Sequence, residues 1–323
     1  MNETPSRSPV VVAGIVIVLV LIGLAVAYLP MAGGIRSWFG LMLAPTEVQQ
    51  LQYLGVENDI GVLYRTNGTT VEKRSFPGYS VVDYVKKGTK EIAILKSDAG
   101  KYDIYDVGGD TPLALTTDGR ERDFIDVSAN GAQVVYGVKA RTVPPLKGFE
   151  DEVTYSLVEW DVELLDTTTK KVSIVGPGNH PRFFKEGLFY PAPTGFIYRV
   201  IDANGFDDKD VGSILPDVMA YRILRIAMLR ADGLLVVPSV VISAYETLTV
   251  DSIDPLRLHA TLTSPIKVPP GTRDLYITQD GQTLLLTPVA GGAMSLAELR
   301  DGEVSTLYTF GPDDHPERFI RSN

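Results

Sequence analysis

The stretch VSANGAQVVYG, residues 127–137, carries the pattern that decides the fold. Polar residues that end in a glycine are followed at once by an apolar run. A tight hairpin turn needs a positive φ angle, which glycine adopts at little cost, and β-branched and aromatic residues favour strands. The stretch therefore predicts a turn at its polar residues and a β-strand directly after them.

The same turn and strand recur along the chain. They begin near residue 56 with VENDIGVLYR, and five later copies each contain a glycine in the turn, at spacings of 43, 56, 46 and 48 residues. Repeats of roughly 40 to 50 residues with about four short strands each are typical of β-propellers. The sequence therefore predicts an all-β propeller. The five glycines are Gly88, Gly131, Gly187, Gly233 and Gly281.

The pattern within single strands supports this architecture. In KYDIYDV, residues 101–107, Tyr102 and Ile104 share one face of the expected strand, and Tyr105 and Val107 share the other. Successive side chains of a strand point to opposite faces. Because both faces carry large apolar groups, we expect sheets to pack against both sides of this strand.

The two ends of the repeat region predict how the ring closes. Only 30 residues separate Asn58 from Gly88, so the first unit lacks strands, and the tail HPERFIRSN (315–323) has the pattern of a lone strand. We expect this strand to complete the first of six blades and so remove open sheet edges. Rings of five or seven blades remain alternatives, as does a pair of face-packed sheets, since short strands with turn signals also describe sandwiches.

The units resemble the TolB-type β-propeller repeat, a WD-repeat-like family whose mark is S-P-D-G-K followed by an apolar strand. The matching stretches are 128–131, 231–233 and 279–282, although the family's proline is missing from each, and PLALTTDG (112–119) is similar to its outer-strand ending. The resemblance covers most of residues 55–312. Related propellers also occur on peptidases in which a hydrolase domain follows. We expect no such domain here, because the sequence ends about a dozen residues after the last unit.

The N-terminus predicts a membrane anchor. Residues 10–29 contain no charge, and twenty helical residues span about 30 Å, the thickness of a bilayer's hydrocarbon core. We therefore predict a tail at 1–9, a transmembrane helix at 10–29, a juxtamembrane linker at 30–47 and the propeller at 48–323. A cleaved signal peptide ending near AVA (25–27) and a buried soluble helix remain alternatives.

The orientation of this single-pass protein follows from a weak charge bias. Arg7 precedes the span and Arg36 follows it, and the free amino terminus adds positive charge on the first side. Positive charge favours the cytoplasmic side, so the large domain is expected to be extracytoplasmic. The reverse orientation stays open.

Composition excludes several classes of function. Thirty basic and 40 acidic residues give a net charge of −10, which disfavours nucleic acid as a partner, because phosphate binding needs clustered lysine and arginine. The chain contains no cysteine, so disulfides, thiol catalysis and thiolate metal sites are excluded.

No motif predicts a catalytic residue or an organic cofactor. The sequence lacks G-x-S-x-G, H-E-x-x-H and the glycine-rich phosphate loops. Of the three histidines, His180 and His315 each precede a proline at the start of an expected inner strand, and His259 has no motif around it. We interpret His180 and His315 as residues of strand-entry turns. Whether the chain is an enzyme is left open.

One acidic segment resembles a calcium loop. DANGFDDKD (202–210) offers several oxygen ligands at close spacing, as Ca²⁺ requires, but its glycine stands fourth rather than sixth. An ordinary solvated loop is the alternative. The candidate ligands are Asp202, Asn204, Asp207, Asp208 and Asp210.

Two insertions, 139–155 and 202–222, are the expected binding surface, because loops on a rigid scaffold carry specificity. The apolar segment 211–228 predicts either a short packed helix or a patch for a partner. The function predicted is a membrane-anchored binding or scaffolding module of the cell envelope, with the bilayer and a protein or glycan as partners. The alternatives are an enzyme that acts on glycans or other envelope substrates through carboxylates about 5–10 Å apart at the channel mouth, and a structural surface component.

Overall fold

The structure is a computed structural model of the 323-residue chain, which divides into two units, Met1–Gln50 and Leu51–Asn323. It describes residues 51–67, 70–142, 159–184, 187–193, 195–202, 205–209, 228–229, 234–238, 244–254, 257–262, 266–278 and 281–320. The predicted tail, transmembrane helix and linker lie outside these ranges and stay predictions. Within the described ranges, no helix has the length and hydropathy of a bilayer-spanning segment.

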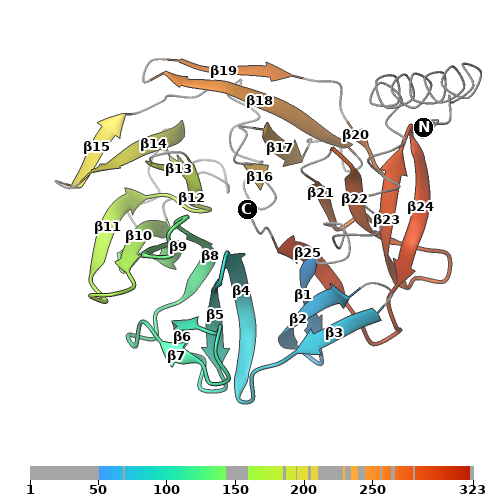
Figure 1. Cartoon of the computed structure of the whole chain (residues 1–323), viewed down its shortest axis with the longest axis horizontal. Helices are drawn as coiled ribbons and strands as arrows, with labels where there is room; N and C mark the ends of the chain where they lie inside the picture. The colour runs from blue at the N-terminus through green and yellow to red at the C-terminus, as the bar shows by residue number, and fades with distance from the viewer. Residues whose placement is uncertain are drawn as a thin grey trace, which may run out of the picture. The chain divides into compact units, whose positions relative to one another are not determined.

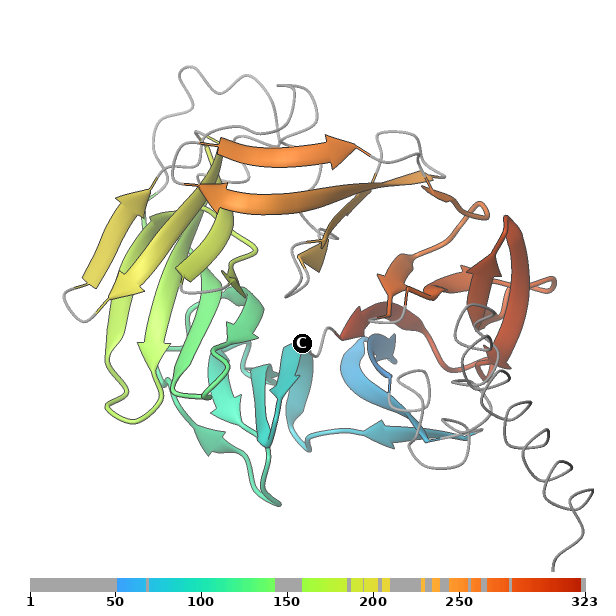
Figure 2. The same cartoon turned by 45° about the horizontal axis from the view of Figure 1, so that its top comes forward.

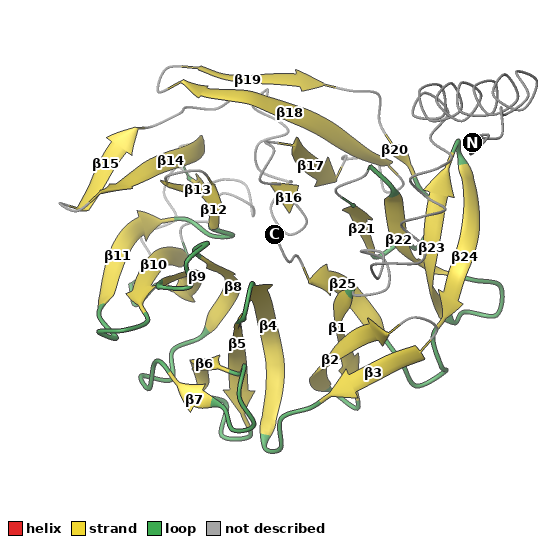
Figure 3. Ribbon diagram, viewed as in Figure 1, coloured by secondary structure: helices red, strands yellow, loops and turns green. Residues whose placement is uncertain are grey.

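Every element of the described residues is a β-strand, which confirms the all-β prediction (Figure 3). The strands form six antiparallel sheets, called here blades one to six, in which neighbouring strands follow one another in sequence, except that β25 pairs with β1 and β20 with β18. Figure 1 shows the blades arranged around an axis, with the first strand of each blade innermost. This propeller-like arrangement of six sheets excludes the alternative of two face-packed sheets.

Blades one to three contain the following strands. Blade one, from the axis outward, is β25 (Pro316–Ile320), β1 (Gln52–Glu57), β2 (Ile60–Asn67) and β3 (Thr70–Arg74); blade two is β4 (Tyr79–Lys87), β5 (Lys90–Ser97), β6 (Tyr102–Asp106) and β7 (Leu113–Ala114); blade three is β8 (Arg122–Val127), β9 (Gln133–Lys139), β10 (Trp160–Asp166) and β11 (Val172–Pro177).

Blades four to six follow the same order. Blade four is β12 (Arg182–Phe184), β13 (Gly187–Ala192), β14 (Gly195–Asp202) and β15 (Gly205–Lys209); blade five is β16 (Met228–Leu229), β17 (Leu234–Pro238), β18 (Ala244–Asp254) and β19 (Arg257–Leu262), with β20 (Ile266–Lys267) paired to β18; blade six is β21 (Asp274–Ile277), β22 (Thr283–Pro288), β23 (Met294–Arg300) and β24 (Glu303–Thr309).

The C-terminal strand closes the ring, as predicted. β25 pairs antiparallel with β1, so that Ile320 lies opposite Gln52. Phe319 of β25 is 3 % exposed and packs against Tyr53 of blade one and Tyr276 of blade six, with ring centroids 5.4 and 5.5 Å apart. One strand thus joins the last blade to the first, and the tilted view in Figure 2 shows these blades side by side.

Three of the five predicted turn glycines have the expected conformation: Gly88, Gly131 and Gly281 have φ angles of 59°, 70° and 87°, and each lies between the first and second strands of its blade. The prediction is wrong for Gly187, which is the first residue of β13 and has no positive φ angle, and Gly233 lies outside the described residues.

The first copy of the repeat is displaced by one strand, because its turn joins β1 and β2, the second and third strands of blade one. This turn has no glycine, and Asn58 and Asp59 take the positive angles, at 50° and 63°. Both residue types tolerate this conformation, which explains why the turn survives without glycine.

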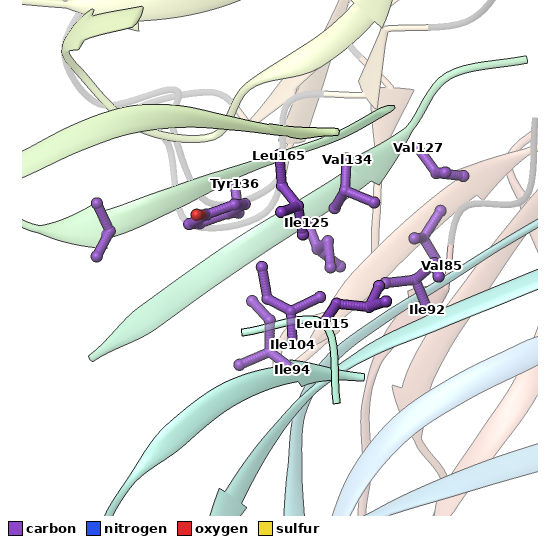
Figure 4. Packing of buried hydrophobic residues seen from close by; sticks show 11 residues of the cluster. Val85, Ile92, Ile94, Ile104, Leu115, Ile125, Val127, Val134, Tyr136 and Leu165 are labelled. Carbon is purple, nitrogen blue, oxygen red and sulfur yellow. The ribbon is translucent and has the colours of Figure 1, made fainter. Parts of the chain in front are cut away.

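The core lies between neighbouring blades. A cluster that includes Ile92, Ile104 and Leu165 fills the boundary of blades two and three (Figure 4). Tyr102 packs on this cluster with Ile104, whereas Tyr105 and Val107 belong to the cluster between blades one and two. The prediction that sheets pack on both faces of β6 is therefore confirmed. Burying each large aliphatic side chain contributes roughly 1.5–3 kcal/mol.

One predicted insertion is partly wrong. Residues 202–222 were expected to be an insertion that begins with the acidic loop 202–210, but Asp202 ends β14 and residues 205–209 form β15, the outer strand of blade four. The reason is that the Ala203–Asn204–Gly205 stretch can also serve as a hairpin connection. The other insertion does separate two strands, β9 and β10, and residues 143–158 lie outside the described ranges.

Candidate functional site

Charged side chains gather on the inner strands, where the sequence analysis placed a hypothetical catalytic mouth. Arg318 of β25 lies at their centre. Its Nη2 atom is 3.2 Å from Asp83 Oδ1 of blade two and 3.9 Å from Asp123 Oδ1 of blade three, and it donates a hydrogen bond of 2.7 Å to Val82 O. One guanidinium therefore connects three blades. Burial acts to lower the pKa of Arg318, but the nearby carboxylates, Asp83 first, outweigh it and raise the pKa.

Asp83 is held by backbone groups on both sides of a blade boundary. Its Oδ1 accepts from the N–H of Tyr84 at 2.8 Å, and its Oδ2 accepts from the N–H of Ile125, on β8 of the next blade, at 2.9 Å. The innermost strand of a sheet has no partner on its axial side, so its N–H groups there need another acceptor. The Asp83 carboxylate supplies that acceptor.

Two further aspartates repeat this arrangement. Asp126 accepts from Val127 N–H and from Phe183 N–H of blade four, each at 2.8 Å. Asp274 accepts from Leu275 N–H and from Phe319 N–H of blade one, again at 2.8 Å. An aspartate of one blade thus fastens the inner strand of the next at three boundaries.

Burial raises the pKa of Asp126, although Arg182, Lys87 and the two amide donors act in the opposite direction. Arg182 of β12 also reaches back across the boundary, and its Nη1 atom donates to Ile125 O at 3.1 Å. Asp126 and Arg182 are thus both engaged in contacts between blades three and four.

A second charged network lies between blades two and three. Arg122 is 1 % exposed, donates to Tyr102 O at 2.7 Å, pairs with Asp118 and lies 5.4 Å from the ring of Tyr136. The Tyr136 hydroxyl donates to Glu163 at 3.0 Å. Burial and then this carboxylate raise the pKa of Tyr136. Arg122 pairs with Asp118, and Glu163 pairs with Arg120. Each buried charge thus has a partner of opposite sign, without which its burial would be costly.

These contacts bear on the enzyme alternative. Asp83 and Asp123 do converge, since both approach one nitrogen within 4 Å, so they lie no farther apart than the ~5–10 Å used in glycoside chemistry. However, Arg318 stands between them and Asp83 accepts two backbone N–H groups. A general acid or nucleophile must be able to exchange a proton or attack a substrate. The geometry is that of a structural fastening.

Two residues near the axis have unusual backbone conformations, and the ring of one, Phe124, lies 5.9 Å from the Arg318 guanidinium. Phe124, at a bulge in β8, and His180, in the turn before β12, have φ angles of 54° and 50°, and their rings contact each other. Bulky residues adopt this region rarely, and only where the surroundings enforce it. His180 and His315 both precede their inner strands, as the sequence analysis predicted, and His259 lies in β19.

The candidate calcium ligands are only partly within the described ranges. Asp202, Asp207 and Asp208 lie in the β14–β15 hairpin, where Asp207 is opposite Val200 and Asp208 opposite Arg199. Asn204 and Asp210 lie outside the described residues. Among the residues that the structure describes, no group of three or more metal-ligating side chains occurs. The calcium site stays a prediction.

The sequence analysis missed the fastening residues, although a weak signal exists for two of them. Asp83 and Asp126 each stand five residues before the turn glycine of their blade, followed by an apolar residue. Arg122 lies in DGRERDF, which has the composition of a solvated loop. No local pattern distinguishes a fully buried arginine from an exposed one.

Comparisons with known proteins bear on the fold. No family model and no curated protein matches the chain. Among solved structures, TolB from Acinetobacter baumannii superposes with a TM-score of 0.57 at 11 % identity, over 84 % of this chain and 65 % of TolB. The chain thus spans about two thirds of the length of that protein.

Two further structures are similar at lower scores. A TolB candidate from Agrobacterium tumefaciens gives a TM-score of 0.43 at 12 % identity, over 83 % of both chains. A puromycin-hydrolyzing peptidase from Mycobacterium tuberculosis gives 0.43 at 12 % identity, over 83 % of this chain and 48 % of the peptidase. The first of the three similarities, together with the blade topology, shows that the chain has a TolB-like β-propeller fold.

Proposed function

We propose that the protein is a membrane-anchored binding or scaffolding module whose propeller lies outside the cytoplasm, in the cell envelope. The observation that carries the proposal is that aspartates near the axis form hydrogen bonds between neighbouring blades. Asp83, Asp126 and Asp274 each accept one backbone N–H group of their own blade and one from the next blade, and such ties between blades favour a rigid ring. Rigid scaffolds present binding surfaces at low entropic cost.

The remaining support comes from the sequence. Residues 10–29 have the length and apolar composition of a membrane span, and a propeller held at a membrane can recruit a protein or glycan partner there. The insertion between β9 and β10 interrupts an otherwise regular repeat, and such loops commonly carry specificity.

Partner capture tests the binding role. The full-length tagged chain is cross-linked in native membranes, solubilised and purified, and co-purifying proteins are quantified against an unrelated single-pass protein of equal abundance. We expect one or a few stoichiometric partners that the control does not recover. Recovery of the chain alone contradicts a binding role, and recovery only of further copies of the chain favours the structural surface component instead.

Protease treatment of intact cells tests the location. We expect an externally added protease to cleave the propeller while a cytoplasmic marker stays intact, and residues 1–9 to stay protected. Protection of the propeller until the membrane is permeabilised contradicts the extracytoplasmic orientation. Release of the uncleaved chain by alkaline carbonate contradicts the anchor.

A further inference from the structure

Exposed apolar side chains gather at the outer rim between blades two and three. Leu113 of β7 is 61 % exposed, and Val172 and Ile174 of β11 are 40 % and 69 % exposed. They are half of the large hydrophobic side chains that the described residues expose to this degree. Single exposed apolar residues are ordinary, but a group of them on one surface marks an interaction site.

The β10–β11 pairing shows that Val172 and Ile174 face blade two. Val172 lies directly opposite Leu165 and therefore shares its face of the sheet. Leu165 belongs to the core between blades two and three. Ile174, two residues farther along the strand, projects from the same face.

Leu113 projects from the opposing surface. It lies opposite Asp106 in the β6–β7 pairing, and Asp106 shares a face with Ile104, two residues earlier. Ile104 belongs to the same core as Leu165. The three exposed side chains thus stand on two facing surfaces, beyond the outer end of the shared core.

A lysine adds positive charge to this surface. Lys170 stands two residues before Val172, and its Nζ atom donates a hydrogen bond of 3.1 Å to Ala114 O of blade two. It forms no ion pair with any carboxylate of the described residues. An acidic group placed here would therefore meet an ammonium whose charge is not yet neutralised.

The backbone of β11 is also open on this side. β11 is the outermost strand of blade three. Its residues Val172–Ile174 pair with β10 in a regular register, and the register shifts only beyond them, between Val162 and Glu163 of β10. The outer strands of blades one and two are less accessible, whereas β24 of blade six is also exposed. β7 has two residues, and Lys73 and Arg74 of β3 are tied into ion pairs.

We propose that this rim surface, defined by Leu113, Lys170, Val172 and Ile174, binds an extended peptide segment of a partner protein. Aliphatic side chains of the segment pack on the three apolar residues, its main chain runs along β11, and an acidic residue pairs with Lys170. Addition of a strand to an open edge is a recurrent mode of peptide recognition. The inference rests on the proposed function, because it assigns a surface to the binding module.

A panel of three synthetic peptides tests the inference. Each alternates valine and threonine over eight residues and ends in two glutamates, two glutamines or two lysines. Binding to the full-length chain in detergent micelles is followed by fluorescence anisotropy. We expect the glutamate peptide to bind most tightly and the lysine peptide most weakly. Equal affinity for the three peptides, or no binding of any, overturns the proposal.

Matched variants locate the site. Ile174→Glu should weaken binding of the glutamate peptide at least tenfold, and Lys170→Gln should remove the preference for glutamate over glutamine. Val304→Glu is the control, because Val304 is a 41 % exposed residue on β24, the outer strand of blade six. An equal loss in Val304→Glu, or no loss in Ile174→Glu, contradicts the assignment. All three residues are exposed, and circular dichroism checks that the variants are folded.

The variants also separate this inference from the proposed function. If the Ile174→Glu variant captures a membrane partner as well as the wild-type chain does, the assignment of the rim surface as the binding site is wrong, and the proposed binding function stands. If the peptides bind as expected but no partner is recovered from membranes, the rim is a peptide site and the envelope function fails.

Discussion

The inner and outer edges of the blades present the same kind of unpaired backbone, yet the molecule treats them differently. At the axis, aspartates of blades two, three and six accept the free N–H groups of the next blade's inner strand. At the rim, β11 and β24 keep exposed apolar side chains, Ile174 at 69 % and Leu307 at 45 %. The unpaired backbone groups at the axis are therefore used to join blades, whereas those at the rim remain available to partners.

The largest expected effect comes from the strand that closes the ring. Phe319→Ala on β25 removes a ring that is 3 % exposed and packs between Tyr53 and Tyr276. We expect a loss of about 3–5 kcal/mol in the free energy of unfolding, measured by urea denaturation of the full-length chain in detergent. Leu307→Ala at the rim should cost less than about 1 kcal/mol. Equal losses would break the contrast between axis and rim.

A smaller effect is expected from the axial carboxylate itself. Asp83→Ala leaves the N–H groups of Tyr84 and Ile125 without their acceptor and removes the nearer carboxylate from Arg318. Unsatisfied buried donors cost about 1–3 kcal/mol, so a loss of about 2–3 kcal/mol is expected in the same measurement.

The control for this change is Asp110→Ala, since Asp110 is exposed in the β6–β7 connection. It should stay within about 0.5 kcal/mol of the wild type. If the two variants were equally stable, the axial hydrogen bonds would contribute nothing net, and the rigidity that supports the proposed function would need another source.

The two regions also differ in how far the sequence predicts them. Turn glycines such as Gly88 and Gly131, and the closing strand, follow from local patterns, because a hairpin is decided by neighbouring residues. The fastening contacts join residues far apart, 42 positions for Asp83 to Ile125 and 236 for Arg318 to Val82. Which side chains meet across a blade boundary depends on the register and twist of both sheets, which no short motif records.

At the rim, the strand β11 could be predicted from the sequence, but the exposure of its apolar side chains could not. KKVSIVG (170–176) has the composition of a strand, and β11 covers most of it. The alternation of polar and apolar residues in this segment does not show that Val172 is exposed. Whether Val172 is buried depends on how far blade two extends beside β11. Whether an apolar side chain is exposed depends on the sheet that packs beside it, and the sequence of its own strand does not contain this information.

Acid should weaken the boundary between blades one and two. Partial burial acts to raise the pKa of Glu91, but hydrogen bonds from Lys86, Tyr84 and Arg74 outweigh it and lower the pKa below 4.5. A carboxyl whose pKa is lowered by folding stabilises the protein above its unfolded pKa, and this contribution is lost as the pH falls through the folded value.

Glu91→Gln measures this contribution. We expect the variant to be less stable than the wild type by about 1 kcal/mol at pH 7, and the gap to narrow as the pH falls below 4.5. A gap that stays constant down to the pH of acid unfolding would show that Glu91 acts through packing. Because Arg74 is 39 % exposed, the effect should remain smaller than that of Asp83→Ala.

The smallest effect is expected at an exposed ion pair of the closure. Lys73 Nζ of β3 lies 2.6 Å from Asp314 and 3.2 Å from Glu57, but the lysine side chain is 40 % exposed. Solvent screens such pairs, so Lys73→Met should cost about 0.5–1 kcal/mol at low salt and less at 1 M salt, where the screening length is about 3 Å. Lys171→Met, at an exposed lysine beside the rim surface, should be neutral under both conditions. A loss for Lys73→Met that persists at high salt would mean that the lysine stem, whose Nζ lies 5.8 Å from the centre of the Tyr64 ring, stabilises the closure by packing.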